Sequence, residues 1–465
     1  MPAAASSPIP AALMKLGSLD SDRVADLRPY LDSVPGPRAR RGRWYSLTAI
    51  LLVGACAVVS GARSIDELAE WGQRAADTLL KTIGIRRHLL GWRRTPSAAT
   101  IGRVLGAVDG DALDQAVGAY LADRHRTATG ARTASPGRAA VIAVDGKALK
   151  GSSRLAAPRR HLLSAVTHGT VVTLAQAEVG TKTNETTHFQ PLLAPLDLAD
   201  TVVTFDALHS VKANITWLIE AKQAHYIAVI KSNQPTTRRQ LASLPWRDIP
   251  VQHAASETGH GRRESRSIKT CAVADELGGI AFPHARLAIR VHRRRKPTGQ
   301  SESRESVYAV TSLDAHQAGP ADLAAAIRGH WAVENSSHHI RDVTFAEDAS
   351  AVHAGTAPRA MASLRNLAIG ALKTLGAENV AKTTRAIRDE PARALPILGI
   401  AVNPGAFGRD GMAQRPAGPG GAVGLRGSPR ALVRGGEASW AIHGSPMNST
   451  GAPSRTQRTV NLEHR

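Results

Sequence analysis

Residues 141–147, with the sequence VIAVDGK, combine an apolar run with an acidic residue near its end. Residues 201–206, TVVTFD, repeat this pattern. Runs rich in Val and Ile are typical of strands buried in a sheet. A carboxylate at the end of such a strand is costly unless a cation binds it. We therefore predict two buried strands that deliver Asp145 and Asp206 to strand ends, where they could hold a divalent metal. The alternative is that each Asp caps a turn or a following helix.

The charge of the chain indicates the kind of partner it binds. Its 465 residues include 59 Lys and Arg against 38 Asp and Glu, a formal net charge of +21 at pH 7. Basic side chains that contact DNA phosphates release condensed counterions, so this charge favours DNA as a partner. The alternative is a basic protein from an arginine-rich proteome, in which the charge has no ligand.

Cysteine usage and hydropathy indicate the compartment. Cys56 and Cys271 stand in unrelated contexts without a histidine pair at zinc spacing, which argues against a disulfide framework or a structural zinc. This fits a reducing cytoplasm. The N-terminus has no signal-peptide pattern. The apolar stretch 47–59 is shorter than the roughly 20 residues of a membrane span, so we expect a buried helix. We predict a cytoplasmic, nucleoid-associated protein without a membrane partner.

Composition and periodicity divide the chain into five segments. Residues 1–22 form an expected flexible lead, and 23–125 an all-helical domain whose basic loops include 86–88 and 93–94. A polar linker at 126–139 precedes an α/β region at 140–400, and the Gly/Pro/Arg-rich tail 401–465 is expected to be disordered. Helices with basic turns suit contact with the DNA backbone, and a packing domain with solvated charges is the equal alternative.

The α/β region has a recognisable order of strands. Apolar runs predict strands at 140–145, 161–167, 170–179, 201–206 and 225–231, with a helix at 211–223 between the last two. This order matches the start of an RNase H-like fold, an α/β architecture with a central mixed sheet.

The segment 250–314 alternates apolar and polar residues, which predicts an antiparallel, strand-rich insertion. The basic run 292–296 is expected at its turn or edge. There it is either a solvated loop or, through Arg293, Arg294 and Arg295, a clamp on phosphates.

A third acid lies on a predicted helix at 320–342. Glu334 is one helical turn from His330 and from His338. Phosphoryl transfer on DNA uses two Mg²⁺ ions about 3.5–4 Å apart, and such hard ions, Mg²⁺ or Mn²⁺, take carboxylate oxygens as ligands. Asp145, Asp206 and Glu334 are therefore the candidate catalytic and metal-binding residues.

Two alternatives concern the same helix and the residues after it. His330, His338 and His339 could form a transition-metal cluster, although their spacing is unusual for zinc. The third acid could also be one of three carboxylates that follow Glu334, namely Asp342, Glu347 and Asp348.

Several blocks of this sequence occur together in one known family. They are VDGKALKGS (144–152), HLLSAV (161–166), KTNE (182–185), VVTFDALHS (202–210), YIAVIKSNQ (226–234), GHGRRESR (259–266) and IRGHWAVENSSHHIRDVTFAEDAS (327–350). In these blocks the chain resembles DDE transposases of the ISAs-type insertion sequences, often called H-repeat-associated. Residues 35–71 resemble the accessory domain that precedes the catalytic core in that family, and the resemblance covers about residues 25–400.

The resemblance implies an RNase H-like core in which Asp145, Asp206 and Glu334 are the first, second and third acids, with two Mg²⁺ ions. It implies cleavage and strand transfer of an insertion-sequence element, with transposon ends and target DNA as partners and a homodimer in the synaptic complex. Residues expected near the DNA or the acids are Lys147, Lys182, Lys231, Asn233 and Gln234.

The chain departs from the family pattern at His339, at Arg341 and at residues 208–210. The three acids themselves are intact. Two other functions stay open at this point. One is a catalytically decayed remnant that only binds DNA, and the other is a nuclease on the same fold.

Overall fold

The computed structural model describes residues 24–39, 44–130, 139–153, 159–180, 185–259, 261–273 and 279–401, apart from the side chains of Ala332, Glu334 and Asn335. The expected lead, all but the first residue of the expected tail, and Lys182 lie outside the described residues.

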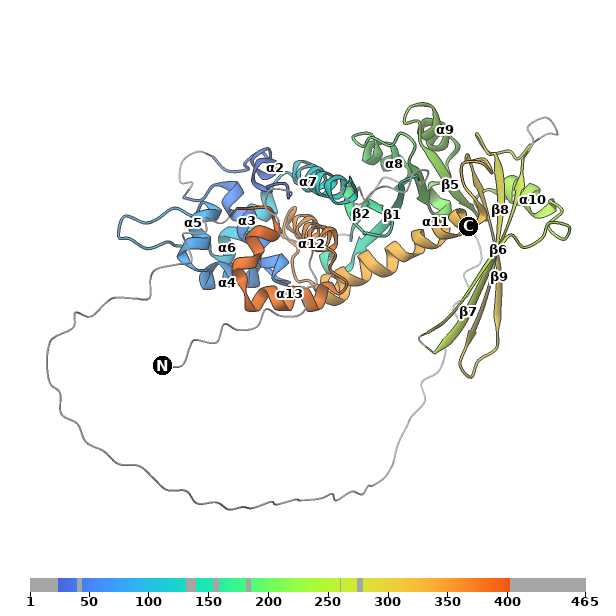
Figure 1. The fold of residues 1–465 in the computed structure, drawn as a ribbon. Coiled ribbons are helices and arrows are strands. Elements are labelled where there is room, and N and C mark those ends of the chain that lie inside the picture. The colour runs from blue at the N-terminus through green and yellow to red at the C-terminus, as the bar shows by residue number, and fades with distance from the viewer. Residues whose placement is uncertain are drawn as a thin grey trace, which may run out of the picture. The chain divides into compact units, whose positions relative to one another are not determined.

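Within the described residues, nine strands form one mixed sheet in the order β3-β2-β1-β4-β5-β9-β8-β7-β6 (Figure 1). The first five strands are β1 (Val141–Leu149), β2 (Arg160–Thr167), β3 (Thr173–Val179), β4 (Val202–Phe205) and β5 (His225–Ile230). β1, β4 and β5 are parallel, whereas β2 runs antiparallel to β1 and β3 runs antiparallel to β2. This is the RNase H-like arrangement, so the predicted fold class is confirmed.

The strand-rich insertion continues this sheet. Its strands are β6 (His253–Gly259), β7 (Arg262–Ala272), β8 (Leu287–Pro297) and β9 (Ser303–Thr311). β9 pairs antiparallel with β5, and β8, β7 and β6 follow in turn.

The expectation that residues 292–296 form a turn or an edge was wrong. They lie inside β8, which pairs with β7 on one side and β9 on the other. A strand can carry consecutive arginines where its side chains reach solvent on both faces of the sheet, because the backbone pairing does not depend on them.

Helices cover both faces of the first five strands. On one face, α8 (Glu185–Leu193), α9 (Lys212–Glu220) and α10 (Pro235–Ser243) pack over a core that includes Val144 and Phe205. On the other face lies α11 (Pro320–Val333), whose apolar residues Leu323 and Ile327 pack against β4, β5 and the insertion (Figure 1). The position of α9 agrees with the helix predicted at 211–223.

The predicted helix at 320–342 changes its geometry after Val333. The α-helical part ends there, and two π-helical turns follow, η5 (Glu334–His338) and η6 (Ile340–Thr344). A π turn inserts an extra residue and re-aims the side chains after it, and such turns are frequent at functional sites. The sequence pattern did not reveal this change.

The N-terminal helices are α2 (Arg28–Asp32), α3 (Leu47–Val59), α4 (Ile65–Arg74), α5 (Asp77–Ile83), α6 (Ala98–Ala107) and α7 (Gly110–Gly130). α3 is buried from residue 49 to its end, as predicted for this apolar stretch. Each fully buried Leu, Ile or Val in it contributes about 1.5–3 kcal/mol. No helix in the described part of the chain is long and apolar enough to cross a membrane. α7 extends to Gly130, so the start of the expected linker at 126–139 is helical.

The last helices of the chain share the core of these N-terminal helices. They are α12 (Ala357–Thr374), α13 (Val380–Asp389) and α14 (Ala394–Ile397). One hydrophobic cluster contains Leu51 of α3, Leu121 of α7 and Leu364 of α12. This C-terminal segment falls within the region 140–400 that the sequence pattern predicts to be α/β. In the structure α12 contacts α3, α7 and β3, so it connects the helices to the sheet.

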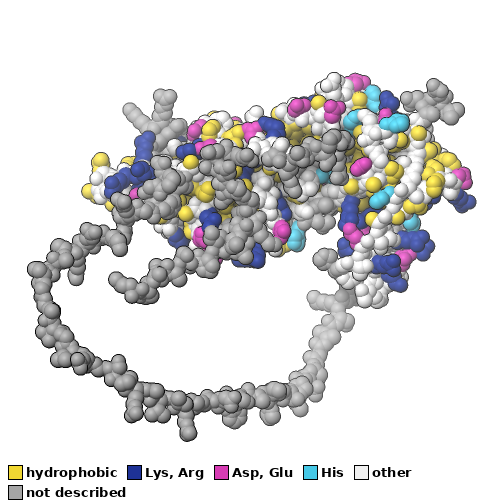
Figure 2. Space-filling model, in the orientation of Figure 1, with side chains coloured by type: hydrophobic (Ala, Val, Ile, Leu, Met, Phe, Trp, Pro, Cys, Tyr) yellow, Lys and Arg dark blue, Asp and Glu magenta, His cyan; other side chains and the backbone are white. Residues whose placement is uncertain are grey.

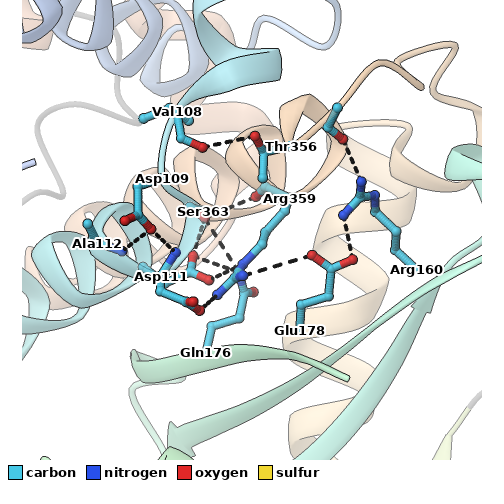
Figure 3. A network of polar contacts seen from close by, with 12 residues as sticks. Val108, Asp109, Asp111, Ala112, Arg160, Gln176, Glu178, Thr356, Arg359 and Ser363 are labelled. Carbon is cyan, nitrogen blue, oxygen red and sulfur yellow. Dashed lines mark hydrogen bonds and ion pairs between the residues drawn. The ribbon is translucent and has the colours of Figure 1, made fainter. Parts of the chain in front are cut away.

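A buried polar network strengthens this connection (Figure 3). Nε of Arg359 on α12 lies 2.7 Å from Oδ2 of Asp114 on α7. Gln176 on β3 donates to Oδ1 of the same carboxylate over 2.9 Å, and Ser363 also donates to it. Arg359 further contacts Asp111 at 2.6 Å. Removing one partner of a buried ion pair costs about 3–5 kcal/mol, so this network holds α7, α12 and β3 together.

Candidate active site

Asp145 and Asp206 occupy equivalent positions on neighbouring parallel strands. The last registered pair between β1 and β4 is Val144 with Phe205, and the two acids follow directly. Adjacent strands lie about 4.7–4.9 Å apart. Val144 and Phe205 point into the core under α8 and α9, so by the alternation of a strand Asp145 and Asp206 point to the opposite face, toward α11.

The two acids end their strands differently from what we predicted. Asp206 does follow the end of β4, but β1 continues to Leu149 because its pairing with β2 extends to Arg160. What ends at Asp145 is the parallel pairing with β4. The expectation of a strand end was therefore wrong for Asp145. The two carboxylates lie at the same height in the sheet because the register of β1 and β4 pairs the residues before them.

Both carboxylates also bond to their local backbone. Oδ1 of Asp206 accepts from the Leu208 N–H at 2.9 Å and caps the short helix η3 (Ala207–His209). Oδ1 of Asp145 accepts from the Gly146 N–H at 2.9 Å. The capping alternative is thus correct in part for Asp206. However, the side chain of Asp206 is exposed, so the cap does not bury the charge.

The backbone brings Glu334 to the same face of the sheet. Val333 packs against Ala143, which points to the same side of β1 as Asp145. Nδ1 of His338 lies 3.8 Å from Oδ2 of Asp145. Glu334 begins the π turn between these two contacts, and its side chain lies outside the described residues. Among the described side chains, no three His, Cys, Asp or Glu residues are arranged to hold a metal, and this includes His330, His338 and His339.

The histidines next to the acids are neutral at pH 7. Oγ1 of Thr204 lies 3.2 Å from Nδ1 of His330 and 3.1 Å from Nε2 of His168, and burial lowers the pKa of both imidazoles to about 4. Burial, together with the charges of Arg341 and Lys147, lowers the pKa of His338 to about 3. These rings therefore add no positive charge to the carboxylates.

Lys147 lies near the acids, as the resemblance implies, but its ammonium group already forms an ion pair within the protein. Its Nζ is 2.7 Å and 2.8 Å from the two carboxylate oxygens of Asp342, and the side chain is 8% exposed. Lys150 holds Asp348 in the same way at 2.7 Å. Two of the three alternatives to Glu334 are thus paired with lysines within the protein, and Lys147 itself is buried.

The third alternative, Glu347, is a buried structural acid. It is 2% exposed between Arg341, at 2.7 Å, and Arg365, at 2.9 Å. Arg365 also donates to the backbone carbonyl of Arg63, which precedes α4. Arg341 is one of the positions at which the sequence departs from the family pattern, and Glu347 compensates its charge inside the fold.

A cluster of polar residues around Glu185 is not evident from the sequence. Its carboxylate lies 2.7 Å from Nε2 of His161 and 3.4 Å from Nε2 of His209. Contact with these imidazoles, His161 first, lowers the pKa of Glu185 to about 2. A Cβ at Gly146 would come within 2.6 Å of His161 and 2.8 Å of Glu185, so this packing needs a glycine beside Asp145. Three separate blocks supply the three residues, and sequence spacing alone could not have paired them.

The residues after β5 brace the loop that carries Asp206. Nδ2 of Asn233 donates to the carbonyl of Ala207, and Nε2 of Gln234 donates to that of Ser210 at 2.8 Å. The exposed Lys231 precedes them, and its charge acts on His330. Of the residues that the resemblance implies near the acids, Asn233 and Gln234 therefore position the backbone, while Lys231 remains accessible.

The basic run of β8 is divided between the two faces of the sheet. Arg293 and Arg295 share a face with Glu264, and Nε of Arg293 lies 2.6 Å from that carboxylate. Arg294 and Lys296 are on the opposite face. On that face β7, β8 and β9 contribute no acid and six basic residues, which we call the basic face: Arg263, Lys269, Arg290, Arg294, Lys296 and Arg304. Lys and Arg side chains are visible on this part of the molecule in Figure 2.

Known protein families match both the N-terminal helices and the α/β region of the chain. Residues 136–370 match the family described as "Transposase DDE domain", and residues 29–121 match "DDE_Tnp_1-associated". The chain is 27% identical over 365 residues to the putative transposase YncI of Escherichia coli O157:H7, covering 75% of this chain and 88% of that protein. It is 28% identical over 358 residues to the H repeat-associated putative transposase YhhI of Escherichia coli K12, covering 74% and 90%.

One solved structure also aligns with the chain. It is the piggyBac transposase in a synaptic complex with hairpin DNA, with a TM-score of 0.36, 11% sequence identity, and coverage of 83% of this chain and 80% of the other.

Proposed function

Because the chain belongs to the DDE transposase family, we propose that it cuts the ends of an insertion-sequence element and joins them to target DNA. Asp145, Asp206 and Glu334 are the proposed catalytic acids. The observation that carries the proposal is the parallel register of β1 and β4. It aligns Asp145 and Asp206 at the same height along neighbouring strands and on the same face of the sheet. Val333 and His338 flank Glu334 over that face.

The donor set fits a hard divalent metal. Asp145 and Asp206 offer carboxylate oxygens, which Mg²⁺ and Mn²⁺ prefer, and the nearby imidazoles are neutral and add no competing cation. Two such ions, when bound, would activate the attacking water or 3′-hydroxyl and stabilise the leaving oxygen. The protein itself fixes the acids. Gly146 N–H orients Asp145, and Leu208 N–H with the braced loop orients Asp206.

DNA would approach along exposed cations. The basic face of β7–β9 offers six cations to phosphates, with Glu302 beside it paired with Arg304, and Lys231 lies between it and Asp206 in the sheet order. Transposon ends and target DNA are the proposed partners. A homodimer is the proposed form in the synaptic complex, since two ends must be held together for joining.

The test uses a supercoiled plasmid that carries the gene with its native flanking DNA. Purified full-length protein with Mg²⁺ is expected to nick or cut at two positions that bracket the gene, and to join the ends to a second plasmid. Without a divalent metal both steps should cease. Cleavage without joining would favour a nuclease on this fold. DNA binding without cleavage, in Mg²⁺ and in Mn²⁺, would favour a decayed copy and would overturn the proposal.

A further inference from the structure

A short hairpin projects from the N-terminal helices between α5 and α6 (Figure 1). The backbone N–H of His88 donates to the carbonyl of Trp92 at 2.7 Å, and that of Gly91 donates to His88 at 2.9 Å. Gly91 has φ of 93°, which closes a three-residue loop of Leu89, Leu90 and Gly91. Arg87 and Arg93 pair below it. The segment therefore has a defined hairpin geometry.

The base of the hairpin is anchored to the helices. Arg93 is 11% exposed, and its Nε lies 3.0 Å from Oδ1 of Asp77 at the start of α5. Above it, His88 stacks on Trp92 with ring centroids 4.4 Å apart, and the ring of Trp44 lies tilted against His88 with its centroid 5.8 Å away. A hollow of 510 Å³, lined by Gln73, Trp92 and other residues, lies between the hairpin and α4. The tip is thus held in place while it stands clear of the protein.

Two leucines occupy the tip of this hairpin. Leu89 is 100% exposed and Leu90 is 79% exposed. The central positions of a turn favour Asn, Asp, Ser, Gly or Pro, which help the backbone to turn. Leucine offers no such help, and a fully solvated leucine contributes nothing to the core. These two side chains are therefore not explained by the folding of the hairpin, and a binding role would explain them.

Charge indicates what the tip binds. Residues 84–95, GIRRHLLGWRRT, contain four arginines and no acid. Arg86, Arg87 and Arg94 are exposed beside the leucines. Trp44 and Trp92 beside the tip are also exposed, at 42% and 45%, but four arginines without an acid favour a polyanion over a protein partner. Apolar wedges flanked by cations are the arrangement with which proteins enter a DNA groove, where the apolar side chains separate two base pairs and the cations contact phosphates.

We propose that Leu89 and Leu90 wedge between base pairs of duplex DNA, while Arg86, Arg87 and Arg94 contact the flanking phosphates. This inference rests on the proposed function in that it needs DNA as the partner, but it is independent of cleavage. A wedge of this kind kinks the duplex by about 20–90°. The N-terminal helices then bend the DNA that the α/β part processes.

The test measures binding and bending without a divalent metal, so that cleavage plays no part. The full-length protein is added to a duplex of about 150 base pairs taken from the DNA that flanks the gene, which is about one persistence length. Affinity is followed by fluorescence anisotropy. Bending is followed by the rate at which complementary single-stranded ends of the protein-bound fragment anneal into circles, read as fluorescence transfer between dyes on the two ends, which needs neither ligase nor Mg²⁺. The wild type is expected to raise the circularisation rate several-fold, because a kink brings the ends together.

Three variants separate the roles. L89A/L90A should no longer accelerate circularisation and should keep its affinity within about threefold, because its phosphate contacts remain. L89M/L90M should retain bending, since methionine is also an apolar wedge. R86A/R87A/R94A should bind more weakly and with a shallower salt dependence. Val251→Ala is the matched control, since Val251 is an exposed apolar residue elsewhere, at 53% exposure. The melting temperature should be unchanged in all of them.

Two results would overturn the inference. One is an L89A/L90A variant that bends DNA as the wild type does. The other is a change in sedimentation of the L89A/L90A protein without DNA, which would assign the leucines to contact between protein copies. Failure of the plasmid cleavage assay would instead count against the proposed function and would leave the bending result to stand.

Discussion

Two sets of acidic residues in this chain differ in what surrounds them. Asp206 is exposed, and Asp145 is 23% exposed beside imidazoles that are neutral at pH 7. In contrast, Glu347 is 2% exposed between two arginines, and Asp114 is 3% exposed and ion-paired with Arg359. All four are carboxylates in or next to regular structure. Burial against a matched cation marks an acid that holds the fold, whereas access to solvent marks an acid available for chemistry.

The largest expected effect tests the accessible set. Asp145→Asn, Asp206→Asn and Glu334→Gln should each reduce DNA cleavage by about 10³-fold or more, because a metal ligand supports several kcal/mol of transition-state stabilisation. Asn caps a helix as well as Asp does, so Asp206→Asn removes the charge and keeps the cap. DNA affinity and the melting temperature should stay near wild type. Parallel loss of cleavage, binding and stability would show that these acids are structural after all.

The buried set should show the opposite behaviour. Glu347→Gln leaves Arg341 and Arg365 buried without their counter-charge and should lower the free energy of unfolding by about 3–5 kcal/mol, measured by urea denaturation. Glu220→Gln is the control at a 64% exposed acid, with an expected change below about 0.5 kcal/mol. A Glu347→Gln protein of normal stability that fails to cleave DNA would move Glu347 into the metal site.

The same distinction applies to the arginines of β8. Replacing Arg294 and Lys296 together by Ala should reduce the slope of log affinity against log salt by about 0.9 for each phosphate that the protein no longer neutralises. Arg293→Ala should leave that slope unchanged, because Arg293 faces Glu264 on the other side of the sheet. The measurement is DNA binding at several salt concentrations. Equal effects of the two changes would mean that the basic face is not the DNA surface.

The smallest expected effect concerns Glu185, which is partly buried and held by histidines. Its pKa is lowered to about 2 in the folded protein, below the roughly 4.3 of an unfolded chain. A lowered pKa means that Glu185 stabilises the fold above about pH 4.3 and loses this contribution as pH falls toward 2. Glu185→Gln should therefore lower the melting temperature at pH 6, and its difference from wild type should shrink between about pH 4.3 and pH 3. A constant difference would show that charge is not what Glu185 contributes.

Sequence patterns predicted the sheet because buried strands are local features. The apolar runs before Asp145 and Asp206 set both strands, and the family resemblance that assigned these residues agrees with the family matches. Contacts between distant segments could not be predicted in this way. The pairing of Lys147 with Asp342, the cluster of Glu185 with His161, and the opposite faces of Arg293 and Arg294 each depend on tertiary packing or register. The roles of Asp145, Asp206 and Glu334 stay predictions until they are tested.

The packing of α12 among the N-terminal helices constrains how the protein is made. About 240 residues separate the end of α7 from the end of α12, and a ribosome adds roughly 5–20 residues each second. The first helices to leave the exit tunnel must therefore wait on the order of 10–50 s for the helix that completes their core. During that time α3 exposes its apolar surface to chaperones and proteases. A chain that stops early, through a frameshift or a nonsense codon, should be degraded rather than persist as a DNA-binding fragment.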